Sequence, residues 1–440
     1  MLLITSAIKA QVTTSSLNGK ITDEKNETVI GAVIKAVHEP SGTTYKTVTD
    51  RNGRYSVTGM KAGGPYKVEI SYIGYRTAVV KGITLKLADN QTLNPSLQES
   101  AELLNEVVVT ADKSMRSSRS GAVTNVNIEQ IAAVPTVSRS MTDLMRLTPQ
   151  GSGTTNGFAI GGGNYRQSNV TVDGAQFNNT FGLGSNVLPG GGSPISIDAL
   201  EQVTVSITPY DVRQSGFTGG AINAVTRSGT NKFKGSAYTY LTSNDLAGKK
   251  VGDYDKMALE DAHANTYGFT LGGPIIKDKL FFFVNGEYED KVTAGPSAVA
   301  NGGVNGKFDN TNRRPVLSDL ESLTRYMQNT YGFTTGPWQG YNAKSPSYRI
   351  LARLDWNINN DHKFNIRFTK SNRKANSGAS NSRNIGTNQQ NNIYNGSNSA
   401  YGSNSAYGMS ALSTRYYSEY RFTSLAAELN SRVGNWNNTL

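Results

Sequence analysis

The sequence predicts an all-β-dominated chain with a β-sandwich at the N-terminus, a mixed α/β region in the middle and the start of an antiparallel transmembrane β-barrel. Three observations lead to this prediction. Short apolar runs separated by turn residues fill the N-terminal part, glycines gather in the middle, and apolar and polar residues alternate after Asn231. The 440 residues hold no long apolar run, which excludes membrane helices of about 20 apolar residues.

Composition excludes several classes of site. Lys and Arg outnumber Asp and Glu by 44 to 33, a net charge of +11, but they are scattered through Asn-, Ser- and Gly-rich sequence. Nucleic-acid binders cluster their cations on one element, so we expect no nucleic-acid partner. The chain has no cysteine, and its three histidines, His38, His263 and His362, lie far apart. We therefore expect no metal, no cofactor and no catalytic residue.

Residues 1–16 are interpreted as a signal-peptide remnant or leader. Met1–Gln11 has a short apolar core followed by small residues, which is typical of the end of a secretory signal. The basic segment that normally precedes such a core is missing. Either the true start lies upstream, or the stretch is a disordered leader.

Residues 17–98 are predicted to form the sandwich, because seven short apolar runs recur there with turn residues between them. Thr49–Tyr55 predicts a hairpin, in which Asp50 and Asn52 bond their own backbone and Gly53 takes a positive φ. A calcium loop is the alternative for these residues. It is excluded because the acidic density and the final glutamate of such a loop are absent.

Four segments of this region resemble the carboxypeptidase-regulatory-like domain. They are Gly19–Asp23, Ile30–Val33, Thr49–Tyr55 and Ser71–Tyr75. The resemblance implies a small transthyretin-like sandwich that has no catalytic residues of its own and often precedes outer-membrane receptors of Bacteroidetes-type bacteria. An enzymatic role is not expected, since no zinc-ligand set accompanies the domain.

The linker at residues 99–119 contains one strand-forming segment, Glu106, Val107, Val108, Val109 and Thr110. Such a segment can add itself to the sheet edge of a partner through backbone hydrogen bonds. It resembles the TonB box, which implies that these five residues bind the energy-coupling protein TonB. The alternative is that the segment is the last strand of the sandwich or the first strand of the next region.

Residues 120–230 are rich in glycine, with triplets at Gly161–Gly163 and Gly190–Gly192. No GxxxxGK[ST] motif is present, so a phosphate loop is excluded. The triplets instead predict backbone packed close to a surrounding wall. Asp173 and Glu201 have no base, metal partner or nucleophile in a known spacing. We expect Asp173 to be a turn residue and Glu201 to be structural.

Five segments in this region resemble, in the same order, the plug domain of TonB-dependent receptors. The departure from the family pattern is a long insert at Thr180–Ser193, whose role the sequence does not reveal. The resemblance implies a mixed α/β domain that blocks a barrel lumen. The matching segments are Asp143–Pro149, Ile160–Gly163, Asn169–Gly174, Ile197–Val203 and Phe217–Thr226.

Residues 231–440 are predicted to supply the first barrel strands. In Tyr348–Ile358, apolar residues occupy one face and polar residues the other, with Leu351 as the exception; the length fits a tilted membrane strand of about 9–11 residues. Lys363–Thr369 repeats the pattern after a tight turn. Long extracellular loops are expected at residues 291–346 and 374–421. The tyrosines of the second offer stacking for sugars or peptides, but a solvated loop is the preferred interpretation.

The strand count predicts an incomplete barrel. Seven strands are expected before Leu440, the last one unfinished, whereas plugged transporters use about 22. We therefore expect the front portion of a longer protein. Leu271–Phe283 resembles the Oar-like subgroup of TonB-dependent outer-membrane receptors.

That resemblance implies a barrel in outer-membrane lipid with its N-terminal domain in the periplasm. It further implies binding of an unknown extracellular solute or protein cargo, which is moved with energy from TonB. The alternative is a surface-adhesion or structural barrel that transports nothing.

Overall fold

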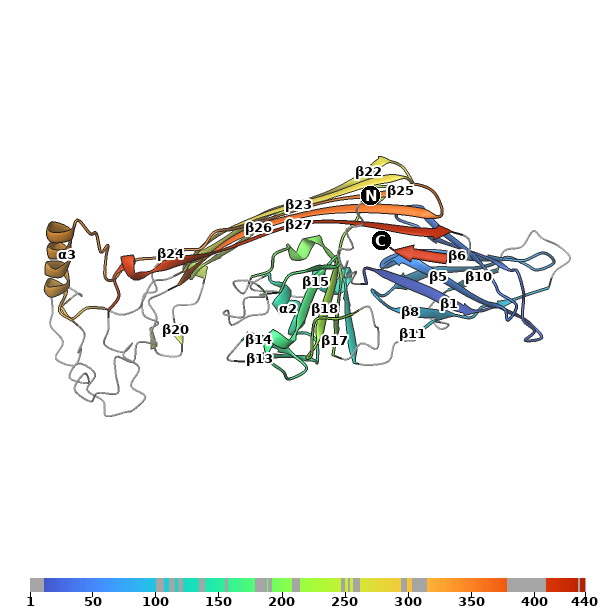
Figure 1. Cartoon of the computed structure of the whole chain (residues 1–440), viewed down its shortest axis with the longest axis horizontal. Helices are drawn as coiled ribbons and strands as arrows, with labels where there is room; N and C mark the ends of the chain where they lie inside the picture. Colours follow the sequence, from blue (N-terminus) through green and yellow to red (C-terminus); the bar gives the residue numbers. More distant parts are fainter. Residues whose placement is uncertain are drawn as a thin grey trace, which may run out of the picture.

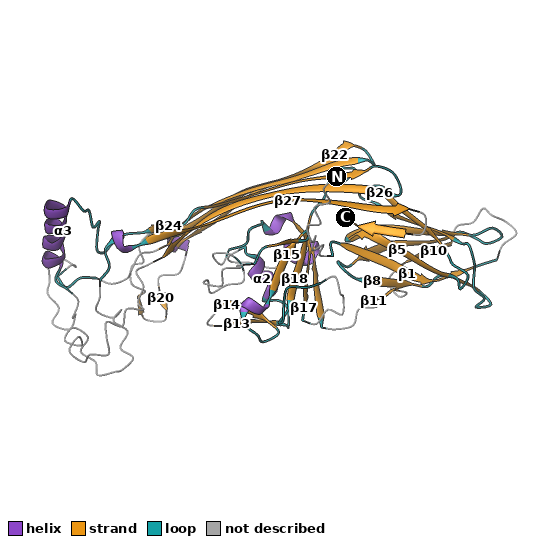
Figure 2. Cartoon of the chain, viewed as in Figure 1, coloured by secondary structure: helices purple, strands orange, loops and turns teal. Residues whose placement is uncertain are grey.

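The computed structural model consists mainly of β-strands in three successive regions (Figures 1 and 2). Figure 1 shows the middle region against the concave side of a long curved sheet, with the N-terminal region near one end of that sheet. The structure describes residues 12–99, 107–110, 115–117, 122–133, 139–154, 157–178, 188, 192–207, 214–246, 250–251, 254–255, 262–293, 299–302, 315–377, 409–433 and 436–439.

The N-terminal region, called the sandwich below, has two main sheets that enclose an apolar core. Alternating side chains point inward along its strands, as in β6, where Tyr66, Val68 and Ile70 are fully buried. A small pair, β2 (Thr22–Asp23) and β9 (Ser96–Leu97), lies beside them. One main sheet has the order β11 (Met115–Ser117), β8 (Asn90–Leu93), β1 (Thr14–Lys20) and β5 (Arg54–Lys61). The other has the order β10 (Val107–Thr110), β7 (Ala78–Leu85), β6 (Gly63–Ser71), β3 (Val33–His38) and β4 (Thr43–Val48).

The turn at Thr49–Tyr55 has the predicted backbone but not the predicted partners. Asp50 Oδ1 accepts hydrogen bonds from the amides of Asn52 and Arg54, both at 2.8 Å, and Gly53 has a φ of +68°. However, β4 and β5 belong to different sheets. The prediction of a hairpin is wrong, because β3 pairs with β4 and β1 pairs with β5.

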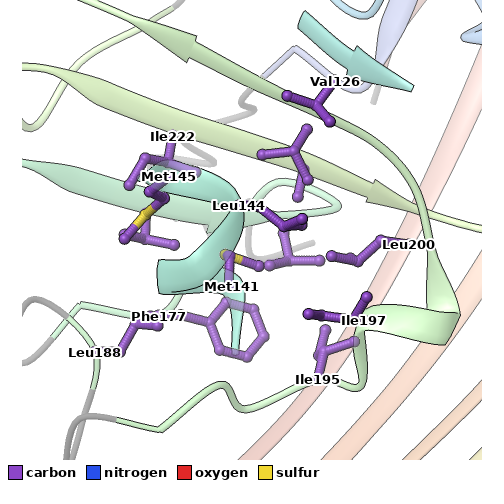
Figure 3. Close-up of a cluster of buried hydrophobic side chains, with 14 of the residues drawn as sticks. Val126, Met141, Leu144, Met145, Phe177, Leu188, Ile195, Ile197, Leu200 and Ile222 are labelled. Carbon is purple, nitrogen blue, oxygen red and sulfur yellow. The ribbon is translucent and has the colours of Figure 1, made fainter. Parts of the chain in front are cut away.

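The second region, called the plug below, combines a mixed sheet with short helices. A capping box formed by Ser140 and Asp143 starts α2. Figure 3 shows the core, in which the residues of α2 pack against the sheet. The sheet order is β12 (Val123–Asn127), β17 (Leu200–Ser206), β18 (Ala221–Thr226), β15 (Asn169–Val172) and β16 (Ala175–Gln176). The other elements are α1 (Ile128–Ala133), α2 (Met141–Met145), the hairpin of β13 (Gly151–Thr154) and β14 (Gly157–Ile160), and two 3₁₀ turns, η2 (Tyr165–Gln167) and η4 (Ile197–Ala199).

The third region is one antiparallel sheet of long strands, called the barrel sheet below. Tight turns join the strands at one end, including that at residues 359–361, as predicted. The strand order is β19 (Lys234–Ser243), β22 (His263–Ile276), β23 (Leu280–Thr293), β25 (Ser347–Asn357), β26 (His362–Ser377), β27 (Tyr416–Val433) and β28 (Trp436–Thr439). Short elements flank it: β20 (Lys250–Val251), β21 (Tyr254–Asp255), β24 (Ala343–Lys344), η5 (Asn244–Leu246) and η8 (Leu412–Thr414).

The two faces of the barrel sheet differ as the alternation predicts. On β25, Ile350, Leu354 and Trp356 are exposed on the outer face, while Arg353 and Asp355 are buried on the inner face. The exception, Leu351, is also on the inner face and is part of the plug core. Its apolar character follows from that contact.

The structure adds one detail to the first predicted long connection and corrects the bounds of the second. The first connection contains a helix, α3 (Leu317–Tyr331), which ends at Gly332 in the left-handed conformation. The second connection is shorter than expected, since β26 runs to Ser377 and β27 begins at Tyr416. These strand ends were missed because residues 374–377 and 416–421 lack the alternation of apolar and polar residues on which the prediction depended. The repeat at residues 397–408 lies outside the described residues.

No helix within the described ranges is long and apolar enough to cross a membrane.

Candidate functional site where sandwich, plug and barrel sheet meet

Asp173 links the plug to the barrel sheet. It follows β15 in the predicted turn, with a φ of +50°. Its carboxylate accepts hydrogen bonds from the amide (3.0 Å) and hydroxyl (2.6 Å) of Thr226, so it is held by its own domain. It also lies 3.7 Å from Arg353 Nη1 and 3.5 Å from Arg367 Nη1. The turn interpretation is therefore incomplete, because Asp173 also forms ion pairs with two barrel strands.

The two arginines are each paired a second time within the barrel sheet. Arg353 Nε and Nη2 donate to the two carboxylate oxygens of Asp355, both at 2.9 Å, and Nη1 donates to the carbonyl of Thr226 at 2.9 Å. Arg367 Nη2 lies 2.9 Å from Glu428 Oε2. All these side chains are buried. The buried charges therefore compensate one another across strands β25, β26 and β27.

The sandwich joins the same network. Lys61 Nζ lies 3.2 Å from Asp355 Oδ1, and Thr13 donates a hydrogen bond of 2.8 Å to Glu428. Burial lowers the pKa of Lys61, although the carboxylate of Asp355 opposes the effect. A cavity of about 290 Å³ lies at this junction and is lined by residues of all three regions. Ion pairs and hydrogen bonds at this junction therefore connect the sandwich, the plug and the barrel sheet.

A second polar cluster ties the plug to strands β19, β23 and β25. Ser196 donates to Glu287 Oε2 at 2.6 Å, and Tyr238 donates to the same oxygen at 3.0 Å. Arg349 pairs with Glu287 and donates to the carbonyl of Ser193 at 2.6 Å. These contacts hold the chain that leaves the insert at Thr180–Ser193, whose earlier residues lie largely outside the described part.

Apolar contacts supplement the charges between plug and barrel sheet. Phe177 of the plug stacks on Phe422 of β27 with ring centroids 4.1 Å apart. Phe283 and Leu351 of the barrel sheet are buried within the plug core. The plug is thus attached by the same kind of packing that holds its own core together.

Two neighbouring residues of β17 contact the sandwich. Gln202, which is 1% exposed, donates to the carbonyl of Leu85 at 3.0 Å and accepts from the amide of Leu87 at 2.8 Å. Glu201 lies beside Gly63, where an added Cβ would be 2.9 Å from its carboxylate. Burial raises the pKa of Glu201. These contacts are packing and docking contacts, in line with the structural role predicted for Glu201.

The glycine triplets serve two different purposes. Gly161 and Gly162 have φ values of +69° and +75°, so they shape a turn within the plug. At Gly192, an added Cβ would lie 1.8 Å from Arg373 Nη1 of β26. The predicted close approach to a surrounding wall therefore holds for Gly192, whereas Gly190 and Gly191 lie outside the described residues.

The TonB-box-like segment is part of the sandwich. Val107–Thr110 forms β10 and pairs in parallel with residues 78–81 of β7; Glu106 lies outside the described residues. The alternative that the segment is a sandwich strand therefore describes its position. Binding of TonB to Glu106, Val107, Val108, Val109 and Thr110 stays a prediction. In the described part of the chain, no group of three acidic or histidine side chains is arranged to hold a metal.

Comparison with known proteins shows which families the chain resembles. Residues 16–98 match the carboxypeptidase regulatory-like domain, and residues 225–435 match an outer membrane beta barrel domain. The TonB-dependent transporter Oar of Myxococcus xanthus is 27% identical over 384 residues, covering 82% of this chain and 34% of that protein. The chain is Oar-like: it resembles this TonB-dependent transporter in sequence and combines a carboxypeptidase regulatory-like domain with an outer membrane barrel domain. It is an outer-membrane β-barrel protein.

Two further proteins are more distant. A probable siderophore receptor, PirA of Acinetobacter baumannii, is 24% identical over 299 residues, covering 60% of this chain and 37% of that protein. Its crystal structure aligns with a TM-score of 0.43 at 17% identity, covering 72% of this chain and 38% of that one. The outer membrane transporter YddB of Escherichia coli aligns with a TM-score of 0.45 at 12% identity, covering 71% and 37%. The chain spans about a third of the length of the curated relatives that it matches.

Proposed function

We propose that this protein binds an extracellular solute or protein cargo and moves it across the outer membrane with energy delivered by TonB. The observation that carries the proposal is the Asp173 network, which fastens the plug to the inner face of the barrel sheet. Cargo can pass only if the plug moves relative to that face. Separating buried ion pairs is costly, so an external energy source is required.

The outer-membrane location determines which energy source is available. The outer membrane has no nucleotide supply, so TonB has to convey the proton-motive force of the inner membrane. We assign its binding to Glu106–Thr110, with the sandwich in the periplasm. The apolar outer face of the barrel sheet, which includes Ile350 and Trp356, contacts outer-membrane lipid.

The TonB assignment is tested by deleting residues 106–110 in the protein as its host makes it. Site-specific cross-linking to TonB should disappear. A matched control is Val108→Ala, which keeps every backbone donor, compared with Val108→Pro, which removes one. Cross-linking that survives the deletion would contradict the assignment.

Transport itself is tested by the accessibility of the plug. Ala224 is fully buried in β18, and the chain has no native cysteine. In Ala224→Cys cells grown in the native medium, a thiol reagent should label the plug faster when the proton gradient is intact. Labelling that is independent of the gradient, together with tolerance of the 106–110 deletion, would favour the adhesion or structural role instead.

A further inference from the structure

We propose that TonB adds a strand to the outer edge of β10 while β10 remains in the sandwich sheet, so that sandwich, box and TonB form one continuous sheet. The inference rests on the proposed function, because it takes TonB as the partner of this segment. It goes further in assigning the sandwich a role as part of the TonB-binding site.

The first observation is the position of β10 at the end of its sheet. Val107 to Thr110 pair with Ala78 to Lys81 in an uninterrupted parallel register. In the sheet order, β10 is followed by β7 on one side, and the described residues place no strand on its other side. Alternate backbone groups of a strand point to opposite edges. One edge of the TonB-box segment is therefore used by β7, and among the described residues the other edge is open to strand addition.

The second observation is that the sandwich holds the linker on both sides of the box. Before the box, Glu99 bridges to Tyr75 and lies 3.4 Å from Lys25. After it, β11 pairs with residues 91–93 of β8, which belongs to the other sheet. The chain reaches the plug strand β12 only after these contacts. A pull on β10 therefore acts on the sandwich before it acts on the linker to the plug.

The third observation connects the same strand to the plug. β7, which holds β10 at residues 78–81, ends at Leu85, and Leu85 and Leu87 hold the buried amide of Gln202. A single strand, β7, therefore connects the TonB-box segment to β17 of the plug. If β10 stays paired, TonB acts on the plug through β7 and Gln202.

TonB can bind β10 in two ways: it can add a strand beside β10, or it can take the place of β7 (strand exchange). The number of backbone hydrogen bonds that must break favours strand addition. Exchange requires the backbone hydrogen bonds between β10 and β7 to break before new ones form. Addition forms new bonds at an edge that faces no strand in the described structure, and breaks none.

A reversible disulfide between β10 and β7 distinguishes strand addition from strand exchange. Val109 and Val80 are register partners, and the chain has no cysteine, so the pair Val109→Cys and Val80→Cys gives one defined disulfide. The protein is purified in detergent, and binding of the TonB periplasmic domain is measured before and after reduction. A disulfide at Asn18→Cys and Ser56→Cys, which are partners in β1 and β5, serves as the matched control.

The expected result is an affinity for the TonB domain that changes less than twofold between the oxidised and reduced forms. Strand exchange would instead be supported, and the proposal overturned, if oxidation lowered the affinity for the TonB domain at least tenfold and reduction restored it. The control disulfide must have no such effect. Absence of binding in both forms and in the unmodified protein would instead refute the proposed function. Hydrogen exchange gives a second measure: the amides of residues 78–81 should stay protected in the TonB complex, and faster exchange there would also overturn it.

The path through Gln202 is tested in cells. Gln202→Leu should leave TonB cross-linking unchanged but reduce gradient-dependent labelling of Ala224→Cys at least fivefold. Gln91→Leu is the control, because Gln91 is also a buried glutamine but lies within the sandwich. Unchanged gradient-dependent labelling in Gln202→Leu, or an equal loss in Gln91→Leu, would overturn this path.

Discussion

The plug and the sandwich are attached to the barrel sheet in different ways. The plug shares an apolar core with it through Phe283 and Leu351 and adds the buried Asp173 pairs. The sandwich meets it mainly through polar groups at the tight turns. The amide of Asn231 donates to the carbonyl of Pro40 at 2.8 Å, and Asn357 donates to Thr43 at 2.9 Å.

This difference indicates how each region separates from the barrel sheet. Apolar surface that leaves a core remains unfavourable in water, so the plug resists removal without work. Polar groups at partly buried turns exchange protein partners for water at little net cost. The sandwich is therefore the more easily released part, and Lys61–Asp355 is its buried ion pair with the sheet.

The largest effect is expected for Asp173→Ala. The change removes the carboxylate that Arg353 and Arg367 share, leaving Asp355 and Glu428 as their remaining partners. It also leaves the Thr226 amide without its acceptor, so the folded protein should lose about 4 kcal/mol. Thermal unfolding in detergent and proteolysis of the plug measure this. Asp361→Ala is the control, since its 2.7 Å pair with Arg432 is largely exposed and should contribute less than about 1 kcal/mol. Equal effects of the two variants would contradict the contrast between buried and exposed attachment.

A slightly smaller effect is expected for Leu351→Ala. Leu351 is 1% exposed and fills the plug core, so its truncation should cost about 3 kcal/mol. Leu354 lies on the opposite face of the same strand and is 42% exposed. Because lipid chains can fill the space it leaves, Leu354→Ala should cost less than about 1 kcal/mol. Thermal unfolding in detergent measures both variants. A larger loss of stability in Leu354→Ala than in Leu351→Ala would contradict the assignment of the plug contact to the inner face.

Strand alternation made the barrel faces predictable, and it also made Leu351 visible as an exception. Its cause could not be predicted, because the plug core that it fills is distant in the sequence. The inner positions of Arg353 and Asp355 were predicted in the same way. Their pairing with Asp173 was not, since pairing depends on how two regions dock. Arginines on the inner face of successive strands, opposite an acidic turn, are the signal that could have indicated it.

Local turn chemistry was predictable, but strand partners were not. Asp50 and Gly53 form the expected turn, yet the flanking strands separate into two sheets because long-range partners compete for each edge. The same limitation applies to β10. Three consecutive valines predict that β10 is a strand. Its pairing with β7 could not be predicted, because it depends on which edge of the sandwich sheet is open.

The sandwich should respond to pH through His38. Burial, with a contribution from Lys61, lowers the pKa of His38 to about 3. Unfolding restores its ordinary pKa of 6.5, so the unfolded chain binds more protons and stability falls as the pH decreases below 6.5. Between pH 7 and pH 5 the loss is about 2 kcal/mol. Hydrogen exchange in β3 and β6, corrected for intrinsic rates, measures it. His38→Gln should remove this dependence, and an unchanged pH profile in that variant would assign it to another group.

The smallest effect is expected for Lys61→Met. Methionine keeps the apolar stem but loses the pair with Asp355, and Asp355 still has Arg353 as a partner. Docking of the sandwich should therefore weaken by only about 1 kcal/mol, while the plug stays attached. The amide of Asn231, which donates to Pro40, should exchange about fivefold faster. Lys46→Met is the control, because its side chain is exposed and should leave this rate unchanged. If Lys61→Met also released the plug, the two attachments would be one cooperative unit, and the sandwich could not detach first.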